Sequence, residues 1–259
     1  MGKIIAFANQ KGGVGKTTTA VNLAAALGEK GKHILLCDFD PQGNATSGFG
    51  INPRALETSV YDLLVDENSD TARAIVPTRW VDVLGANVEL AGAELSLIGM
   101  ERREYRLRAV LEQVRDRYDY LFIDCPPSLG LLTINCLCAA DSVLVPLQCE
   151  YYALEGLSQL MTTIRTVQKV LNPAIRLEGV LLTMFDGRTN LAIQVTEEVK
   201  KHFGRDVYAT VVPRNVRLSE APSHGQPVTS YDRYSRGAEA YRALAEEFLE
   251  RDAQRGGGK

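Results

Sequence analysis

Short apolar runs alternate with longer amphipathic segments along the whole chain of 259 residues. The apolar runs have the length of buried strands, and turn-forming or acidic residues follow several of them. The segments between them repeat apolar residues at every third or fourth position, which is typical of helices that cover a sheet. The predicted strands span residues 4–8, 33–38, 81–85, 120–124, 142–147, 177–184 and 207–212.

Five segments are long and periodic enough to predict helices. They lie near residues 16–29, 103–118, 154–171, 190–203 and 237–251. The alternation of strands and helices predicts an α/β fold, with a mostly parallel twisted sheet and helices on both of its faces. We expect a single domain over residues 1–252 and a disordered tail at residues 253–259, because the end of the chain is rich in glycine.

The polar segment after the first predicted strand carries the most chemistry. Residues 9–18 read Asn-Gln-Lys-Gly-Gly-Val-Gly-Lys-Thr-Thr between a strand and a helix, which is the layout of a loop that binds nucleotide phosphates. Glycines in such a loop turn backbone N–H groups toward an anion, and the next helix adds the positive end of its dipole. The predicted phosphate-binding residues are Lys11, Gly12, Gly13, Val14, Gly15, Lys16, Thr17 and Thr18.

Two lysines give this loop its particular form. Lys16 is placed to reach the β- and γ-phosphates, and the Thr17 hydroxyl can bind Mg²⁺. The common pattern has glycine where this chain has Gln10, so the match is to the deviant form K-G-G-x-G-K-T with Lys11 as an additional lysine. Two neighbouring ammonium groups repel each other in an empty subunit, whereas a bound triphosphate attracts a second cation, including one from another molecule.

Acidic residues follow two of the predicted strands. Asp38 and Asp40 end the run at 33–38, where Pro41 stops the strand, and Asp124 ends the run at 120–124. Alternate positions on a strand face the same way, so we expect the carboxylates of Asp38 and Asp40 to point in one direction. Because ligands of parallel sheets bind beyond the carboxyl ends of the strands, these acids should lie beside the phosphate loop. There they would hold hydrated metal and orient an attacking water.

Composition excludes some classes of protein. Hydrophobic residues make up 45% and charged residues 24%, and the formal net charge of −3 argues against a wholly basic nucleic-acid-binding protein. Residues 176–236, with 9 Lys/Arg against 7 Asp/Glu, are nevertheless less acidic than residues 1–175, with 16 against 20. Without a signal peptide or a stretch long enough to span a bilayer, we expect a cytoplasmic protein that binds no membrane. The cysteines lack zinc-site spacing and are expected to be reduced core residues.

The chain resembles the ParA/Soj family of partitioning ATPases, within the deviant Walker A superfamily that includes MinD. The resemblance covers nearly the whole chain. Besides the phosphate loop, it is carried by the blocks DFDPQGNAT at 38–46, LAGAEL at 90–95, DCPPSLGLLT at 124–133, QCEYYALEGL at 148–157 and VPRNVRLSEAP at 212–222.

This resemblance implies a dimeric switch that uses ATP and Mg²⁺. Two ATP-bound subunits would pair face to face as a homodimer, with Lys11 reaching the partner's phosphates and Asp40 positioning the hydrolytic water. Asp124 would lie near Mg²⁺ but outside its direct ligands, and Pro213 with Asn215 would contact the adenine. The ATP-bound dimer would bind double-stranded DNA without sequence preference, on the nucleoid. A ParB-type partner that binds centromere-like DNA would stimulate a slow intrinsic hydrolysis and release the dimer.

Two arginines are the candidate DNA contacts. Arg188 precedes the predicted helix 190–203, and Arg217 follows the segment expected to bind the base. The family resemblance implies that both bind phosphates, which requires no sequence information. The alternative is that they form surface ion pairs with neighbours such as Asp186 and Glu220.

Three other functions stay open at this point. A MinD-like ATPase that positions division would need a basic amphipathic helix at the C-terminus, but this end is acidic and then glycine-rich. A reductase resembling the nitrogenase iron protein would need cysteines that bind a cluster. An ATP-regulated effector of replication initiation or transcription cannot be separated from a partitioning ATPase by sequence.

Overall fold

The computed structural model describes residues 1–150 and 153–256, and it contains one sheet of seven strands in the order β3-β4-β2-β5-β1-β6-β7. All neighbouring strands are parallel except β3 and β4. Sequential strands that are parallel require crossover helices, which accounts for the alternation seen in the sequence. The strands are β1 (Lys3–Phe7), β2 (Ile34–Asp38), β3 (Ile75–Pro77), β4 (Asp82–Leu84), β5 (Tyr120–Asp124), β6 (Ser142–Gln148) and β7 (Arg176–Thr183).

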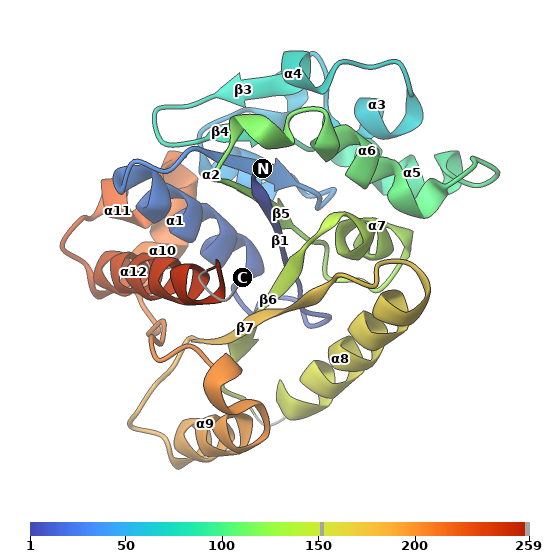
Figure 1. Ribbon diagram of the computed structural model, residues 1–259. Coiled ribbons are helices and arrows are strands. Elements are labelled where there is room, and N and C mark those ends of the chain that lie inside the picture. The colour runs from blue at the N-terminus through green and yellow to red at the C-terminus, as the bar shows by residue number, and fades with distance from the viewer. Residues whose placement is uncertain (151–152, 257–259) are drawn as a thin grey trace.

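Helices cover both faces of this sheet, which confirms the predicted fold class (Figure 1). The α-helices are α1 (Lys16–Glu29), α2 (Asn44–Gly48), α3 (Val60–Val65), α4 (Thr71–Ala74), α5 (Ala93–Ser96), α6 (Arg106–Glu112), α7 (Leu131–Ala139), α8 (Ala153–Val170), α9 (Asn190–Phe203), α10 (Val216–Glu220), α11 (Val228–Tyr231) and α12 (Arg236–Gly256). Short 3₁₀ turns span Pro53–Ala55, Val88–Gly92, Arg103–Tyr105, Arg115–Arg117, Gly204–Asp206 and Ala221–His224.

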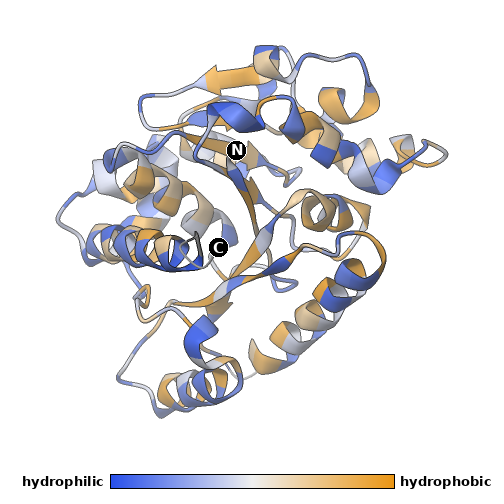
Figure 2. Ribbon diagram, viewed as in Figure 1, coloured by the Kyte–Doolittle hydropathy of each residue, from blue (hydrophilic) through white to orange (hydrophobic). Residues whose placement is uncertain are grey.

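The sheet separates two apolar cores because successive strand residues face opposite sides. On β1, Ile4 and Ala6 pack in the core shared with α6, α7, α8 and α9, whereas Ile5 and Phe7 pack in the core shared with α1 and α12. In Figure 2 the central strands are largely hydrophobic and hydrophilic residues recur along α12. Both faces of the central strands are therefore buried, as parallel strands require.

Two predicted elements differ from the structure, and one strand was not predicted. Residues 207–212 form only an isolated bridge to β7, because Glu247 of α12 accepts the amide protons of Ala209 and Thr210. The predicted helix 103–118 is broken into α6 and two flanking 3₁₀ turns, and Arg102 before it has a left-handed φ of 52°. The edge strand β3 was not predicted, since it is short and ends in proline.

The C-terminal helix also extends further than predicted. Residues 253–256, expected in a disordered tail, continue α12, while residues 257–259 lie outside the described part. Arg255 explains the extension, because its guanidinium binds the buried carboxylate of Glu178 at 2.6 Å. Lys3 of β1 binds the same carboxylate at 2.9 Å and also Asp252 of α12 at 2.6 Å. We call Lys3, Glu178, Asp252 and Arg255 the C-terminal anchor. It lies at the amino edge of the sheet, away from the phosphate loop.

Candidate functional site

The phosphate loop and the two acidic strand ends meet at the carboxyl edge of the sheet. The register of the three central strands aligns Phe7 of β1 with Asp124 of β5, and Asp124 with Asp38 of β2. The loop that leaves β1 therefore starts next to Asp124, with Asp38 one strand further along the same rim. The parallel sheet confirms that the predicted strand ends lie on one rim.

Glycine is required where the phosphate loop enters α1. Gly13 and Gly15 have φ values of 72° and 87°, in the left-handed region that other residues rarely adopt, and Gly15 is the N-cap of α1. A Cβ at Gly12 or Gly13 would meet nothing within 4 Å, so the space beside the loop is open. An N-terminus of a helix with free N–H groups beside an open space is suited to bind an anion.

Two polar side chains that the sequence did not single out hold this loop in shape. The Asn9 side chain accepts a hydrogen bond from the Lys11 amide at 3.0 Å and donates one to the Pro146 carbonyl of β6 at 2.8 Å. Further along the loop, the Thr183 hydroxyl at the end of β7 donates to the Val14 carbonyl at 2.8 Å. The ends of β6 and β7, on the same side of β1, thus fix the loop before any ligand binds. The only local signal for Asn9 was its position directly after an apolar run.

Lys16 is folded into the loop. Its side chain is nearly buried, and its ammonium donates to the Lys11 carbonyl at 3.2 Å. Burial lowers the pKa of Lys16, and the nearby charge of Asp124 is the main effect that opposes the shift. A desolvated ammonium that is bound only by a backbone carbonyl gains strongly from a phosphate placed beside it.

The two acids at the strand ends differ in what they bind. Asp38 and Asp124 are both fully buried. Asp38 accepts hydrogen bonds from the amide of Asp40 and from the amide and hydroxyl of Thr46. Neither carboxylate oxygen of Asp124 accepts a well-formed hydrogen bond among the described residues, although the Thr17 hydroxyl lies close enough to lower the pKa of Asp124. Asp124 is therefore the acid that is free to bind water or a metal.

Burial and mutual repulsion perturb both acids. Burial raises the pKa of Asp38 from 3.8 to about 6, against the hydrogen bonds from Thr46. The pKa of Asp124 is raised by burial and then by the charge of Asp38, while Thr17 and Lys16 oppose the shift. Such a site is electrostatically incomplete, because two buried carboxylates lie side by side and the Lys16 ammonium offsets the charge of Asp124. A divalent cation would relieve this, so the residues fit Mg²⁺ with Thr17 and Asp124 nearest to it.

Asp40 does not extend β2 as predicted. The strand ends at Asp38, and Asp40 lies in the turn that follows, with its amide bound by Asp38 and its carboxylate accepting from the Gln42 amide at 3.0 Å. The expectation that Asp38 and Asp40 project together from one strand was therefore wrong. Asp40 is nonetheless 8% exposed and contributes to the charge around Lys16, so it lies at the same rim.

Lys11 binds an acid of its own chain. Its ammonium lies 2.5 Å from a carboxylate oxygen of Glu150, just beyond the end of β6, and the two side chains are 41% and 47% exposed. The sequence had not indicated Glu150 as a partner. An ion pair this exposed is weak and readily exchanged for another contact.

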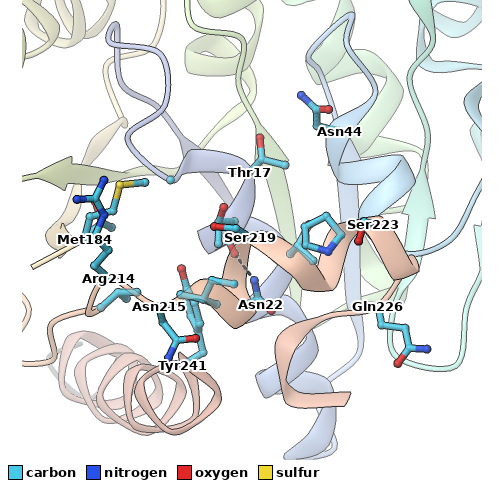
Figure 3. A pocket seen from close by; sticks show the side chains of 18 of the residues that line it. Thr17, Asn22, Asn44, Met184, Arg214, Asn215, Ser219, Ser223, Gln226 and Tyr241 are labelled. Carbon is cyan, nitrogen blue, oxygen red and sulfur yellow. Dashed lines mark hydrogen bonds between the residues drawn. The ribbon is translucent and has the colours of Figure 1, made fainter. Parts of the chain in front are cut away.

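A cavity of about 670 Å³ opens beside the start of α1 (Figure 3). Gly15, Thr17 and Thr18 line it at one end, and Pro213 and Asn215 line it from the loop after residue 212. The structure thus brings the predicted base-binding residues next to the predicted phosphate-binding residues. Other lining residues labelled in Figure 3 include Asn22, Asn44, Met184, Ser219, Gln226 and Tyr241.

The two candidate DNA-binding arginines both form surface ion pairs. The side chain of Arg188 is 89% exposed and binds both carboxylate oxygens of Asp186, which lowers the pKa of Asp186 to about 2. Arg217 is 50% exposed and binds Glu220 at 2.7 Å and Asp232 at 3.1 Å. The alternative of ion pairing is therefore realised, but such exposed pairs leave a guanidinium accessible to phosphate.

Other kinds of site find no support in the described part of the chain. The five cysteines are free and buried, and no group of three or more His, Cys, Asp or Glu side chains is arranged to hold a metal among the described residues. Burial raises the pKa of the Cys37, Cys136 and Cys149 thiols and that of Cys138 to about 11. Within residues 1–150 and 153–256, none of the helices combines the length and the apolar character needed to cross a bilayer.

Comparison with known proteins gives the family. A family model described as an AAA domain matches residues 2–177. The chain is 63% identical to the sporulation initiation inhibitor protein Soj of Bacillus subtilis, over 95% of this chain and 98% of that protein. It is 54% identical to the chromosome partitioning protein ParA of Myxococcus xanthus, over 97% and 89% of the two chains.

A solved structure of similar fold contains nucleotide. Cobyrinic acid a,c-diamide synthase of Mycobacterium smegmatis, with a bound ATP analog and magnesium, has a TM-score of 0.84 and 40% identity, over 96% of this chain and 95% of that chain. The phosphate loop, the acidic strand ends and the cavity lined by Pro213 and Asn215 lie in one place, and together with these similarities they identify the family. The chain belongs to the ParA/Soj family of partitioning ATPases, a family with an AAA domain.

Proposed function

We propose that this protein binds ATP with Mg²⁺ and hydrolyses it as a switch in chromosome or plasmid partitioning. The observation that carries the proposal is the combination of an open, preformed phosphate loop with a fully buried Asp124 whose two oxygens have no partner among the described residues. A buried unpaired carboxylate is costly unless a ligand completes it. The nucleotide-bound M. smegmatis structure supports the same ligands.

We infer the following roles for the residues around the triphosphate. Backbone N–H groups of residues 13–16 and the Lys16 ammonium would bind the β- and γ-phosphates. The Thr17 hydroxyl would hold Mg²⁺, with Asp124 accepting hydrogen bonds from its water ligands; the bound ion would neutralise charge that develops on the phosphate oxygens. Asp40 would orient the attacking water. Pro213 and Asn215 line the same cavity and would contact the adenine.

Dimerisation on ATP is the second part of the proposal. In the single chain Lys11 is held by Glu150 at the surface, beside the open loop. A partner subunit with bound triphosphate offers Lys11 more negative charge than Glu150 does, so ATP favours a homodimer in which each Lys11 crosses to the other site.

DNA binding and release follow from that dimer. Arg188 and Arg217 would contact phosphates of double-stranded DNA without reading its sequence, and a dimer doubles these contacts. A ParB-type partner would stimulate hydrolysis and so return the protein to the monomer, which binds DNA only weakly. Such a cycle places the protein in the cytoplasm on the nucleoid. The relatives named Soj and ParA support this reading over that of the synthase, because their identity to the chain is higher.

The C-terminal anchor argues against the MinD-like alternative. A membrane-binding helix must be free to lay an apolar face on lipid. Here Phe248 and Tyr241 of α12 are buried in the core, and Asp252 and Arg255 tie the end of the helix to β1 and β7. Sedimentation with anionic liposomes in the presence of ATP tests this, and we expect the protein to stay in the supernatant.

The nucleotide dependence of DNA binding tests the proposed switch. Retention on a random duplex would be measured with ADP, ATP and a slowly hydrolysed analogue, for the wild type and Lys16→Ala. We expect retention with ATP and the analogue only, and none for Lys16→Ala, whose ATP-induced thermal stabilisation should also disappear. Binding that is the same in all three nucleotides would refute the switch, while the thermal shift reports separately whether ATP binds.

A further inference from the structure

Thr46 of α2 joins three chain segments at the turn that carries Asp40, and it has no part in the function proposed above. It is completely buried. Its amide and its hydroxyl both donate to the same oxygen of Asp38, each at 2.7 Å. Its hydroxyl oxygen in turn accepts the amide proton of Ala86, after β4, at 3.1 Å. The hydroxyl therefore uses its donor and an acceptor position at once, so no other side chain except serine could replace both contacts.

Asp38, whose orientation is fixed by Thr46, also binds Asp40. The second carboxylate oxygen of Asp38 accepts the amide proton of Asp40 at 3.2 Å. The Asp40 carbonyl then accepts from the Gly43 amide at 2.9 Å, which closes the turn. Gly43 has a φ of 63°, and a Cβ there would lie 3.0 Å from the Ala86 carbonyl, so the turn also rests directly on the Ala86 segment. We call the bonds among Asp38, Thr46 and Ala86, with the bond from Asp40, the Asp38–Thr46 clasp.

The clasp distinguishes the two buried acids. Asp38 has three donors on its two oxygens, whereas Asp124, next to it in the sheet register, has none among the described residues. A carboxylate already bound by an amide and a hydroxyl on one oxygen has little capacity left for a metal or a water. The acid that is exposed to the ligand is Asp124, and the acid that shapes the turn is Asp38.

We propose that Thr46 is a positioning residue for ATP hydrolysis, which orients Asp38 and through it holds the Asp40 turn in the geometry that hydrolysis requires. This inference rests on the proposed ATPase function. Thr46 itself lies outside the cavity lining, where Asn44 and Ser47 of the same helix are found. Loss of its hydroxyl should therefore disturb the reaction step more than ATP binding, because a displacement of about 1 Å in a catalytic group lowers the rate by up to about 100-fold.

Thr46→Val and Thr46→Ser test the role of the hydroxyl, because valine keeps the shape and serine keeps the donor and acceptor. We expect Thr46→Val to lower kcat for ATP by at least about tenfold with KM changed by less than about twofold, and Thr46→Ser to restore most of kcat. Thr71→Val is the matched control. Thr71 is also completely buried and donates its hydroxyl proton to the Val110 carbonyl at 3.0 Å, so its loss should reduce stability and leave kcat of the folded protein unchanged.

Amide hydrogen exchange of the nucleotide-free protein gives a second readout that needs no hydrolysis. We expect Thr46→Val to accelerate exchange at Asp40 and Ala86 by at least about tenfold relative to Thr71→Val. Unchanged exchange at Asp40, a kcat equal to that of wild type, or failure of Thr46→Ser to restore kcat would each overturn the inference. A wild type that does not hydrolyse ATP would refute the proposed function, and the exchange comparison would still decide whether the clasp exists.

Discussion

Glu150→Gln should strengthen ATP-dependent dimerisation, because it releases Lys11 from its ion pair within the same chain. Both side chains of this ion pair are close to half exposed, so each pair contributes only about 0.2–1 kcal/mol. Two such pairs must open when a symmetric dimer forms, which amounts to roughly 0.4–2 kcal/mol. Their removal should therefore lower the dimer dissociation constant by about 2-fold to about 30-fold.

Sedimentation equilibrium with a slowly hydrolysed ATP analogue measures this effect without turnover. Glu155→Gln is the control, because this substitution removes the same charge close to Lys11. Glu155 lies near Lys11 at the start of α8 and forms no ion pair among the described residues. The gain of Glu150→Gln over Glu155→Gln should shrink as salt rises from about 0.05 M to about 0.5 M, because the exposed pair is screened. Equal or weaker dimerisation of Glu150→Gln at low salt would refute the idea that Glu150 competes for Lys11.

Three further predictions follow from the charged groups. Glu178→Gln should lower the free energy of unfolding in urea by roughly 3–5 kcal/mol, because Lys3 and Arg255 lose a buried carboxylate as their partner. The kcat for ATP should stay unchanged. A loss of activity without a loss of stability would contradict the role of Glu178 in the C-terminal anchor. In nucleotide-free protein the raised pKa of Asp38 means that the folded state holds a proton between pH 3.8 and about 6 that the unfolded state has released. Asp38 thus contributes about 3 kcal/mol of stability below that range, which is lost as pH rises through it. Asp38→Asn should make the urea-measured stability fall less steeply over this interval, and the raised pKa of Asp124 accounts for the fall that remains. Replacing Arg188 and Arg217 by alanine should reduce the slope of log K for DNA binding against log salt concentration by about 0.9 for each phosphate that the protein no longer binds. An unchanged slope would refute their role in DNA binding and show that they form surface ion pairs only.

The central strands and the phosphate loop could be predicted because their signals are local. A run such as residues 120–124 is apolar at every position but the last, and Gly13 and Gly15 mark a turn that only glycine makes easily. The parallel topology then places Asp38, Asp124 and the loop together without further information. Pro213 and Asn215 were placed by family resemblance, and the structure puts them in the cavity beside α1.

The features that sequence reasoning missed depend on contacts between distant segments. Glu150 meets Lys11 across 139 positions of sequence, and Thr46 meets Ala86 across 40. Nothing near either residue indicates its partner. The segment 207–212 shows the reverse case: its apolar pattern fits a strand, but the carboxylate of Glu247 binds two of its amides and limits pairing with β7. The local hydrophobic pattern therefore indicates which residues are buried, whereas the tertiary structure determines which distant residues form hydrogen bonds or ion pairs.

The burial of all five cysteines has a practical consequence for following the cycle in solution. Thiols with raised pKa values carry little thiolate at neutral pH, so maleimide dyes should react with them slowly. One cysteine introduced at an accessible position, such as Leu95 at 75% exposure, should then accept a fluorophore selectively in an otherwise natural background. Energy transfer between donor- and acceptor-labelled copies would report in real time how long two subunits stay together after each nucleotide is added.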